Sequence, residues 1–389
     1  MSDLNDYFDP VSIDSPAIEF LNSQAGFAHN ISIHTESSSI KDLENFRIAL
    51  IGIPEGRNSV NPGSSKAPDA VRSELYRLAR IPGKLKIADL GNMKQGTTFN
   101  DTLAGLSDIL VTLFELNTLP VIIGGSSALI PALDMAFSRT NTRYSLTAID
   151  SRICYNHEKQ HKNTLNYLGS IIDKSDSTFT FYSNIGYQTF LNDQQVLNRF
   201  LRKGSDLIRV GDVRNSISLM EPLMRDSEAI VLNIAAVRQS DAPGTACPSP
   251  NGFYGEEICL LSRFAGISDR VKVFGLFDVN PEFDVRSQTT ALAAQIIWFF
   301  LEGFSQKQYE TPLLGSGDPG RFIKYHVKVT GMDDDLIFVK SNLTERWWME
   351  LNAGDSSEAF VACSHDDYLK ANRNEVPERW FKAVERLKH

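Results

Sequence analysis

The sequence predicts a three-layer α/β/α fold with a mainly parallel sheet and a small C-terminal appendage. Apolar strands alternate with helical segments from about residue 47 to residue 301. The strands are apolar throughout, which is typical of parallel strands that are covered on both faces. After residue 303 the pattern changes to apolar and polar residues in alternation, which indicates a half-exposed antiparallel sheet.

The elements follow one another in order. Residues 1–45 are polar and mixed, with one short helix expected around Ser15–Leu21. We then expect strands at 47–53, 84–88, 119–123, 144–149, 179–182, 206–210, 229–234 and 271–277. A helix starts at Ala67 with Pro68 in its first turn, and further helices are expected at 101–116, 128–137, 163–172, 193–202, 216–224, 255–265 and 287–301. The last part should hold strands at 322–329 and 335–340, a third extended segment from Arg346, and a terminal helix at 378–387. This divides the chain into an N-terminal extension (1–45), an α/β domain (46–304) and a C-terminal appendage (305–389).

Composition excludes several classes of protein. A net charge of −9 is the opposite of the basic face that nucleic-acid binding requires. The longest apolar run, 291–301, is too short to span a bilayer, and the acidic start has no apolar core of a signal peptide. The spacing of Cys154, Cys247, Cys259 and Cys363 fits neither paired metal ligands nor a disulfide framework. We therefore expect a soluble cytoplasmic protein with reduced thiols that binds neither nucleic acid nor membranes.

Three strand ends are the candidate site. They are 119–127, 144–154 and 229–238, and the second of them ends in an acidic residue, Asp150. In open α/β sheets, ligands bind outside the carboxyl ends of the strands. The sequence therefore predicts a cleft where these ends meet.

With these strand ends placed, the chain resembles a known family. Together with 53–72, 252–257 and Asp278-Val-Asn-Pro, they are similar in order and spacing to the ureohydrolases, which are arginases, agmatinases and formimidoylglutamases. The segment from Asn61 to Arg72 resembles the family's glycine-rich loop and helix start, and the segment from Asp241 to Pro248, Asp-Ala-Pro-Gly-Thr-Ala-Cys-Pro, resembles its substrate-side loop. The resemblance implies an oligomer and a pair of Mn²⁺ ions that activate water against guanidino or formimino groups. It also implies metal ligands in the motifs Gly-Gly-Asp-His, Asp-Ala-His-x-Asp and Asp-x-Asp.

This chain departs from those motifs. It has Gly124-Gly125-Ser126-Ser127, Asp150-Ser151-Arg152-Ile153-Cys154 and Asn233-Ile234-Ala235, so among the implied ligand positions Asp150 keeps its type. Asn233 offers a neutral oxygen, and the soft Cys154 suits manganese poorly. Arg152 cannot lose its proton, and we predict that its guanidinium replaces the metals and pairs with Asp150, the alternative being that it points into solvent. The degenerate site therefore comprises Ser126, Ser127, Asp150, Arg152, Cys154, Asn233, Ala235 and Asp278.

Several functions follow from this pattern. We expect a non-catalytic binding or scaffold protein that forms a homo-oligomer, needs no cofactor and holds a small molecule or anion in the old cleft. The alternative is a manganese-dependent hydrolase of linear amidines, such as formiminoglutamate, with a rebuilt site. The segment His157-Glu-Lys-Gln-His161 also matches the motif of zinc hydrolases. Cys154 is either a nucleophile or a buried structural thiol. The glycines at 124–125 are compatible with anion binding by backbone N–H groups. Trp347 and Trp348 should face opposite sides of a strand, one of them towards the α/β domain.

Overall fold

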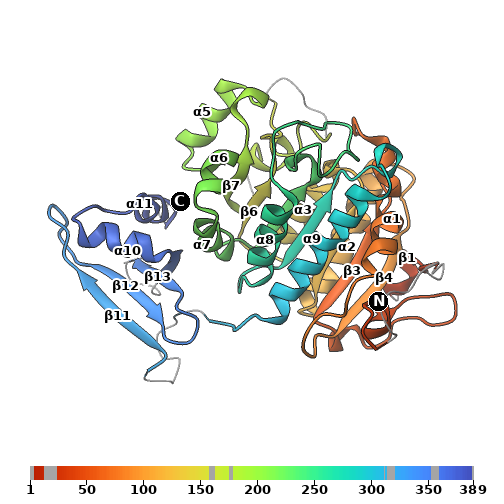
Figure 1. Cartoon of the computed structure of the whole chain (residues 1–389), viewed down its shortest axis with the longest axis horizontal. Helices are drawn as coiled ribbons and strands as arrows, with labels where there is room; N and C mark the ends of the chain where they lie inside the picture. The colour runs from red at the N-terminus through yellow and green to blue at the C-terminus, as the bar shows by residue number, and fades with distance from the viewer. Residues whose placement is uncertain are drawn as a thin grey trace.

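A ten-stranded sheet forms the centre of the protein in the computed structural model (Figure 1). The strand order is β1-β4-β3-β5-β10-β9-β6-β7-β8, with β2 also paired to β4. From β4 to β8 in this order all neighbours are parallel, whereas β1 is antiparallel to β4. The predicted mainly parallel sheet is therefore confirmed. The structure describes residues 4–12, 24–156, 163–174, 178–310, 312, 320–351 and 359–387.

The strands of this sheet are short and mostly buried. They are β1 (Phe8–Asp9), β2 (Ser32–Ile33), β3 (Ile48–Ile53), β4 (Ile87–Met93), β5 (Leu119–Gly124), β6 (Tyr144–Ile149), β7 (Phe179–Tyr187), β8 (Asp206–Arg209), β9 (Ala229–Asn233) and β10 (Val273–Phe277). The α-helices between them are α1 (Ala67–Leu75), α2 (Phe99–Glu115), α3 (Pro131–Arg139), α4 (Gly169–Ile172), α5 (Gln194–Arg202), α6 (Val210–Asn215), α7 (Met220–Arg225), α8 (Gly255–Gly266) and α9 (Gln288–Ser305). The 3-10 turns are η1 (Leu4–Tyr7), η2 (Ala28–Asn30), η3 (Leu43–Asn45), η4 (Pro62–Lys66), η5 (Ser127–Leu129), η6 (Thr189–Leu191), η7 (Ile217–Leu219), η8 (Ile234–Ala236) and η9 (Pro281–Phe283).

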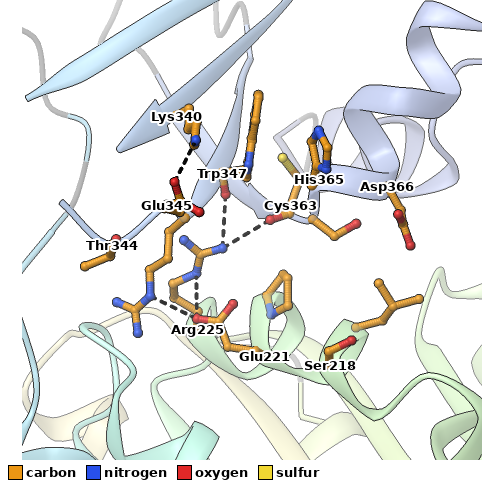
Figure 2. A pocket seen from close by; sticks show the side chains of 14 residues that line it. Ser218, Glu221, Arg225, Lys340, Thr344, Glu345, Trp347, Cys363, His365 and Asp366 are labelled. Carbon is orange, nitrogen blue, oxygen red and sulfur yellow. Dashed lines mark hydrogen bonds and ion pairs between the residues drawn. The ribbon is translucent and has the colours of Figure 1, made fainter. Parts of the chain in front are cut away.

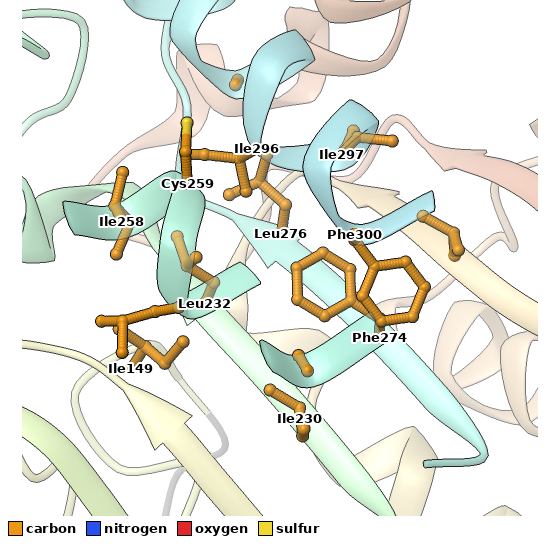
Figure 3. Packing of buried hydrophobic residues seen from close by; sticks show 14 of the residues in the cluster. Ile149, Ile230, Leu232, Ile258, Cys259, Phe274, Leu276, Ile296, Ile297 and Phe300 are labelled. Carbon is orange, nitrogen blue, oxygen red and sulfur yellow. The ribbon is translucent and has the colours of Figure 1, made fainter. Parts of the chain in front are cut away.

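Helices cover both faces of the sheet and give three layers. Successive residues of a strand point to opposite faces of the sheet. In β3, Leu50 therefore packs in the core on one face, which α1, α7, α8 and α9 cover, and Ile51 packs in the core on the other face, which α2, α3 and α5 cover. Figure 3 shows the first of these cores, where Phe274 of β10 stacks on Phe300 of α9 with ring centroids 4.3 Å apart. Each such buried side chain contributes about 1.5–3 kcal/mol. The three-layer α/β/α prediction is confirmed.

Several expected boundaries were wrong. The strand expected at 179–182 runs on to Tyr187, and the helix expected at 216–224 is divided into η7 and α7. Two other differences have a local reason. The strand expected at 84–88 runs instead from Ile87 to Met93, because the polar Asp89 in its middle is satisfied by Arg72, whose Nε donates to it over 2.9 Å. The helix expected at 163–172 is reduced to α4, because the side chain of Asn163 accepts from the backbone of Leu165 and favours a turn. The helix expected around residues 15–21 lies outside the described residues.

The C-terminal lobe, residues 320–351 and 359–387, has its own antiparallel sheet of four strands in the order β11-β12-β13-β14. The strands are β11 (Phe322–Val327), β12 (Leu336–Ser341), β13 (Trp347–Leu351) and β14 (Ala359–Cys363), and α10 (His365–Asn372) and α11 (Glu378–Leu387) follow. The terminal helix was predicted, whereas β14 and α10 were not. Trp347 packs in the lobe's core, 4.8 Å from the ring of Tyr368.

The lobe docks at the amino ends of the strands of the α/β domain. Lys382 pairs with Asp206 at the start of β8 over 2.8 Å, and the carboxylate of Asp226, just before β9, accepts from the backbone N–H of Ala362 over 3.0 Å. Trp348 faces the domain, with the guanidinium carbon of Arg225 4.4 Å from its ring centroid. The prediction that one of the two tryptophans packs on the domain is confirmed, and the lobe lies at the end of the sheet opposite to the expected cleft. Within the described part of the chain, no helix has the length and apolar character of a membrane span.

Candidate functional site at the carboxyl ends of the strands

The predicted strand ends meet at one edge of the sheet. β5, β10, β9 and β6 are consecutive neighbours, so the residues that follow them are brought side by side. A small cavity of about 40 Å³ is lined there by Asp150, Arg152, Cys154, Asn233, Ala235 and Asp278. Ser127 lies behind them, and its backbone N–H donates to Asp278 over 3.2 Å.

Close packing explains the glycines after β5. A Cβ on Gly124 would lie 2.3 Å from the ring of Phe277, and one on Gly125 would lie 2.2 Å from the carbonyl oxygen of Glu55. The backbone N–H of Gly125 donates to Ile53, and that of Ser126 to Glu55. The Ser126 hydroxyl accepts from Ala128 and so caps η5. The N–H groups of this segment therefore have protein acceptors, which removes the basis for the alternative of an anion held by them.

Asp278 is the centre of a hydrogen-bonded cluster. It is buried and has a left-handed backbone with φ of 64°. Its carboxylate accepts from the backbone of Ser127 and, over 2.8 Å, from Nδ2 of Asn233. Burial raises the pKa of Asp278 to about 6, and the hydrogen bonds from Ser127 and Asn233 oppose this rise.

Asn233 presents a donor to the cluster, because its oxygen is already engaged. Oδ1 accepts from the backbone N–H of Ala235 over 2.9 Å and caps η8. That bond turns Nδ2 towards Asp278. The neutral oxygen of Asn233, which the sequence analysis named as an available donor atom, therefore caps a turn of helix instead.

Asp150 is a second buried carboxyl group in the same cavity. Burial raises its pKa to about 7; the backbone N–H of Arg152 lowers it, and the charge of Asp278 raises it further. The backbone N–H of Arg152 donates to Oδ1 of Asp150 over 3.0 Å. The two acids therefore hold their protons far more readily than exposed carboxyl groups do.

The predicted ion pair between Arg152 and Asp150 is wrong. The guanidinium Nη1 of Arg152 donates instead to the carbonyl of Leu191 over 3.0 Å. The reason is local: the chain turns directly after β6, so the backbone of Arg152 reaches Asp150 while its side chain extends towards the loop after β7. Arg152 is half-buried, so it does not point freely into solvent either.

Cys154 is a buried thiol. Burial raises its pKa well above the ordinary value, the charge of Asp150 raises it further, and Sγ lies 3.9 Å from Oδ2 of Asp150. This opposes the alternative in which Arg152 activates Cys154 as a nucleophile, because a nucleophilic thiol needs a lowered pKa. The structure therefore supports the structural role.

Other residues of the cavity were not predicted. Asn61, Thr245 and the exposed Cys247 line it as well. Asn61 donates from Nδ2 to the backbone carbonyl of Asp278 over 2.7 Å. The signal for them was the pair of loop segments at 61–72 and 241–248, which the resemblance placed near the cleft without assigning single side chains. His157 and His161 lie outside the described residues.

Comparison with known proteins agrees with this architecture. Residues 46–302 match the arginase family. The formimidoylglutamase of Bacillus subtilis is 21% identical over 285 residues, which are 67% of this chain and 88% of that protein. The crystal structure of Trypanosoma cruzi formiminoglutamase with Mn²⁺ superposes with a TM-score of 0.64 at 18% identity, covering 69% of this chain and 97% of that one. The structure of the Bacillus subtilis enzyme gives a TM-score of 0.66 at 18% identity, covering 76% and 97%.

Proposed function

This chain belongs to the arginase family, and from that premise we propose that it is a non-catalytic member that binds a small ligand at the carboxyl ends of its strands. The proposal departs from the hydrolytic activity that the names of its relatives describe. It rests on the side chains found at the positions where the family resemblance implies metal ligands.

Those side chains do not fit a pair of manganese ions. Such ions prefer carboxylate oxygens and imidazole nitrogens in near-octahedral sets. Of the implied positions, Ala235 has no donor atom in its side chain, Arg152 is a permanent cation, and Cys154 is a buried thiol. In the described part of the chain, no three His, Cys, Asp or Glu side chains come together in a way that suits a metal ion. We therefore derive no catalytic step through a metal.

The observation that carries the proposal is the orientation of Asn233. In a metal site, the side chains that surround the ion direct their lone pairs towards it. Here Oδ1 of Asn233 accepts from Ala235, so its N–H group points at Asp278 and takes the role that a cation would have. The backbone N–H of Ser127 also donates to the Asp278 carboxylate, at its other oxygen.

The charge of the cavity indicates the class of ligand. Asp150 and Asp278 contribute two acidic groups, and the guanidinium of Arg152 is held by Leu191. Buried acids favour a cation or a group rich in N–H donors over an anion. We therefore propose a small amidine-like or amide-like group as the ligand, in place of the anion that the sequence left open. A cavity of about 40 Å³ admits only a few atoms of it.

Hydrolysis of a linear amidine at a rebuilt site is the second candidate. One observation favours it: two buried carboxyl groups with raised pKa values share a cavity, and such groups are often acids or bases in catalysis. The formimidoylglutamase name of the relatives gives formiminoglutamate as the substrate to test first.

Metal analysis separates the two candidates. The purified protein is incubated with Mn²⁺, desalted and analysed for manganese, and its melting temperature is measured with and without the ion. We expect no retained manganese and no shift, because an ion that binds the folded state raises the melting temperature by mass action. Acetamidine, in contrast, should raise it, and Asp150→Asn should abolish this effect. Retained manganese together with turnover of formiminoglutamate would refute the proposal.

A variant that restores the family's ligand types serves as the positive control. It carries Ser126→Asp, Ser127→His, Arg152→His, Cys154→Asp, Asn233→Asp and Ala235→Asp. We expect this variant, unlike the wild type, to retain manganese. Retention of manganese by both proteins would show that the natural side chains are sufficient to bind the ion.

We propose a homo-oligomer in the cytoplasm, on the family resemblance and on cysteine spacing without a disulfide pattern. Sedimentation velocity tests the first part, and fractionation of the producing cells tests the second.

A further inference from the structure

A second and larger cavity lies between α7 and the C-terminal lobe. Its volume is about 420 Å³, against about 40 Å³ for the cavity at the strand ends. Glu221 and Arg225 line it from α7, and Lys340, Glu345, Arg346 and Asp366 line it from the lobe (Figure 2). Small-ligand sites commonly occupy a few hundred Å³ between two domains. The family match ends at residue 302, so it covers the α7 side of this cavity but not the side that the lobe contributes.

Arg225 forms the buried floor of this cavity with part of its hydrogen-bonding capacity unused. The residue is 3% exposed. Nη2 donates to the carbonyls of Trp347 and Cys363 over 3.0 and 3.2 Å. Nε and Nη1, however, have no hydrogen-bond acceptor within the described part of the chain. Burial lowers the pKa of this guanidinium, and the nearby charge of Glu221 only partly offsets the cost.

Arg346 places a second guanidinium beside the first. Its Nε and the Nε of Arg225 lie 3.1 and 3.4 Å from the same oxygen, Oε1 of Glu221. That oxygen and Nη1 of Arg346 also lack a hydrogen-bond partner among the described residues. Asp269 approaches Nη1 of Arg346 only to 3.8 Å. The floor therefore holds two guanidinium groups against one carboxylate, and Nη1 of each guanidinium lacks a hydrogen-bond acceptor among the described residues, which is costly at a buried site.

The mouth of the cavity carries two acids, Glu345 and Asp366, and one lysine, Lys340. Glu345 is 80% exposed and pairs weakly with Lys340 over 3.2 Å, and Asp366 is exposed. Figure 2 shows Glu345 close to the Arg225 guanidinium, with its carboxylate turned towards Lys340, and Asp366 farther away, beyond His365. The stacked rings of Trp347 and His365, 5.2 Å apart, add an apolar wall. A polyanion would be repelled by the mouth, and a simple cation by the floor.

We propose that this interdomain cavity binds a small zwitterion of the α-amino acid type. Its carboxylate accepts from Nη1 of Arg225 and Nη1 of Arg346, which lack an acceptor among the described residues, and its ammonium group faces Glu345 and Asp366. Such a ligand contacts α7 and the lobe at once, so its binding stabilises the docked lobe. The site lies at the amino ends of the strands and is independent of the cleft proposed above.

L-Glutamine, which has a neutral side chain, is the first probe. It is titrated into the full-length protein by calorimetry, with acetate and n-butylamine as probes that carry one charge each. We expect L-glutamine to bind and the other two to bind at least about tenfold more weakly, since each of them lacks one of the two charged groups and the hydrogen bonds that this group makes. Failure of L-glutamine to bind, or equal binding of either single-charge probe, overturns the proposal.

Variants then locate the binding site. Arg346→Gln and Asp366→Asn should each weaken L-glutamine binding about tenfold, whereas Arg373→Gln and Asp333→Asn, exposed positions of the lobe outside the cavity, should leave it unchanged. Asp366 is exposed, so its variant keeps the fold even if the loss of Arg346 disturbs docking. Unchanged binding in Asp366→Asn, or loss of binding in Asp150→Asn, would place the ligand elsewhere and overturn the proposal.

Discussion

The stability of the wild type should fall as pH rises through the neutral range, and Asp150→Asn should remove most of this effect. Burial raises the pKa of Asp150 to about 7 from the ordinary value near 3.8, so the folded state holds a proton that the unfolded state has released. Stability falls with rising pH wherever the folded state binds more protons. The stabilisation is fully present below the unfolded pKa and is lost as pH passes the folded pKa.

The magnitude follows from these two pKa values. Between about pH 5 and about pH 8, the linkage relation gives a loss of about 3 kcal/mol from Asp150. Asp278, raised to about 6, adds about 1 kcal/mol in the same direction. In Asp150→Asn the amide oxygen still accepts from the backbone of Arg152, and the uncharged group no longer repels Asp278. Above neutral pH this variant should therefore be more stable than the wild type.

Urea unfolding at a series of pH values measures the effect, with Asp333→Asn as the control for loss of an exposed carboxylate. The difference in unfolding free energy between Asp150→Asn and the wild type should grow by about 3 kcal/mol from about pH 5 to about pH 8. A constant difference would mean that Asp150 is not a desolvated acid in solution. If Mn²⁺ made the wild type more stable than Asp150→Asn at high pH, the ion would be holding the carboxylates ionised, which would contradict the proposed function.

Three further changes test the packing. Arg225→Met leaves the Trp347 and Cys363 carbonyls without their donor and Glu221 with one cation fewer, so it should cost about 3 kcal/mol in urea unfolding and alter tryptophan fluorescence as the lobe loosens. Arg72→Leu leaves the buried Asp89 unpaired and should cost about 3–5 kcal/mol by the same measurement; a neutral result would mean that the pair adds nothing. Gly266→Ala places a Cβ 2.1 Å from the carbonyl oxygen of Phe300, so α8 and α9 must separate and the melting temperature should fall, whereas Gly211→Ala, with open space around it, should leave tertiary packing intact.

The sequence predicted the α/β domain well because its signals are local and repeated. Strands such as 144–149 and 119–124 are apolar at nearly every position, and each is followed by a helical segment. Parallel pairing then follows from the alternation, and the meeting of the strand ends follows from parallel pairing. The order of strands and helices is therefore enough to bring Asp150, Asn233 and Asp278 to one edge of the sheet.

The sequence could not give the partners of those side chains. The Arg152 side chain is oriented by the carbonyl of Leu191, which lies almost forty residues later in the chain. The Asn233 side chain is oriented by the backbone N–H of Ala235, in the turn of helix that follows it directly. The sequence indicated that one tryptophan faces the domain but not where the lobe docks, because docking depends on Arg225, a charged residue whose burial has no signature in hydrophobic periodicity. In each case a polar residue is satisfied by a contact distant in sequence or by a turn that propensity does not specify.

The chemistry of the strand ends supports the proposal that this edge of the sheet needs no bound cation to fold. Two carboxylates about 4 Å apart repel each other by about 4 kcal/mol at an effective dielectric constant near 20, and further acids would add to this cost. In this chain the acids are fewer, and the groups around them donate hydrogen bonds: Ser127 and Asn233 to Asp278, and Arg152 to Asp150. The raised pKa values of both acids remove the remaining repulsion by keeping a proton in the cluster at mildly acidic pH. A ligand with N–H groups would replace that proton, so its affinity should increase as pH rises through about 7, where Asp150 ionises.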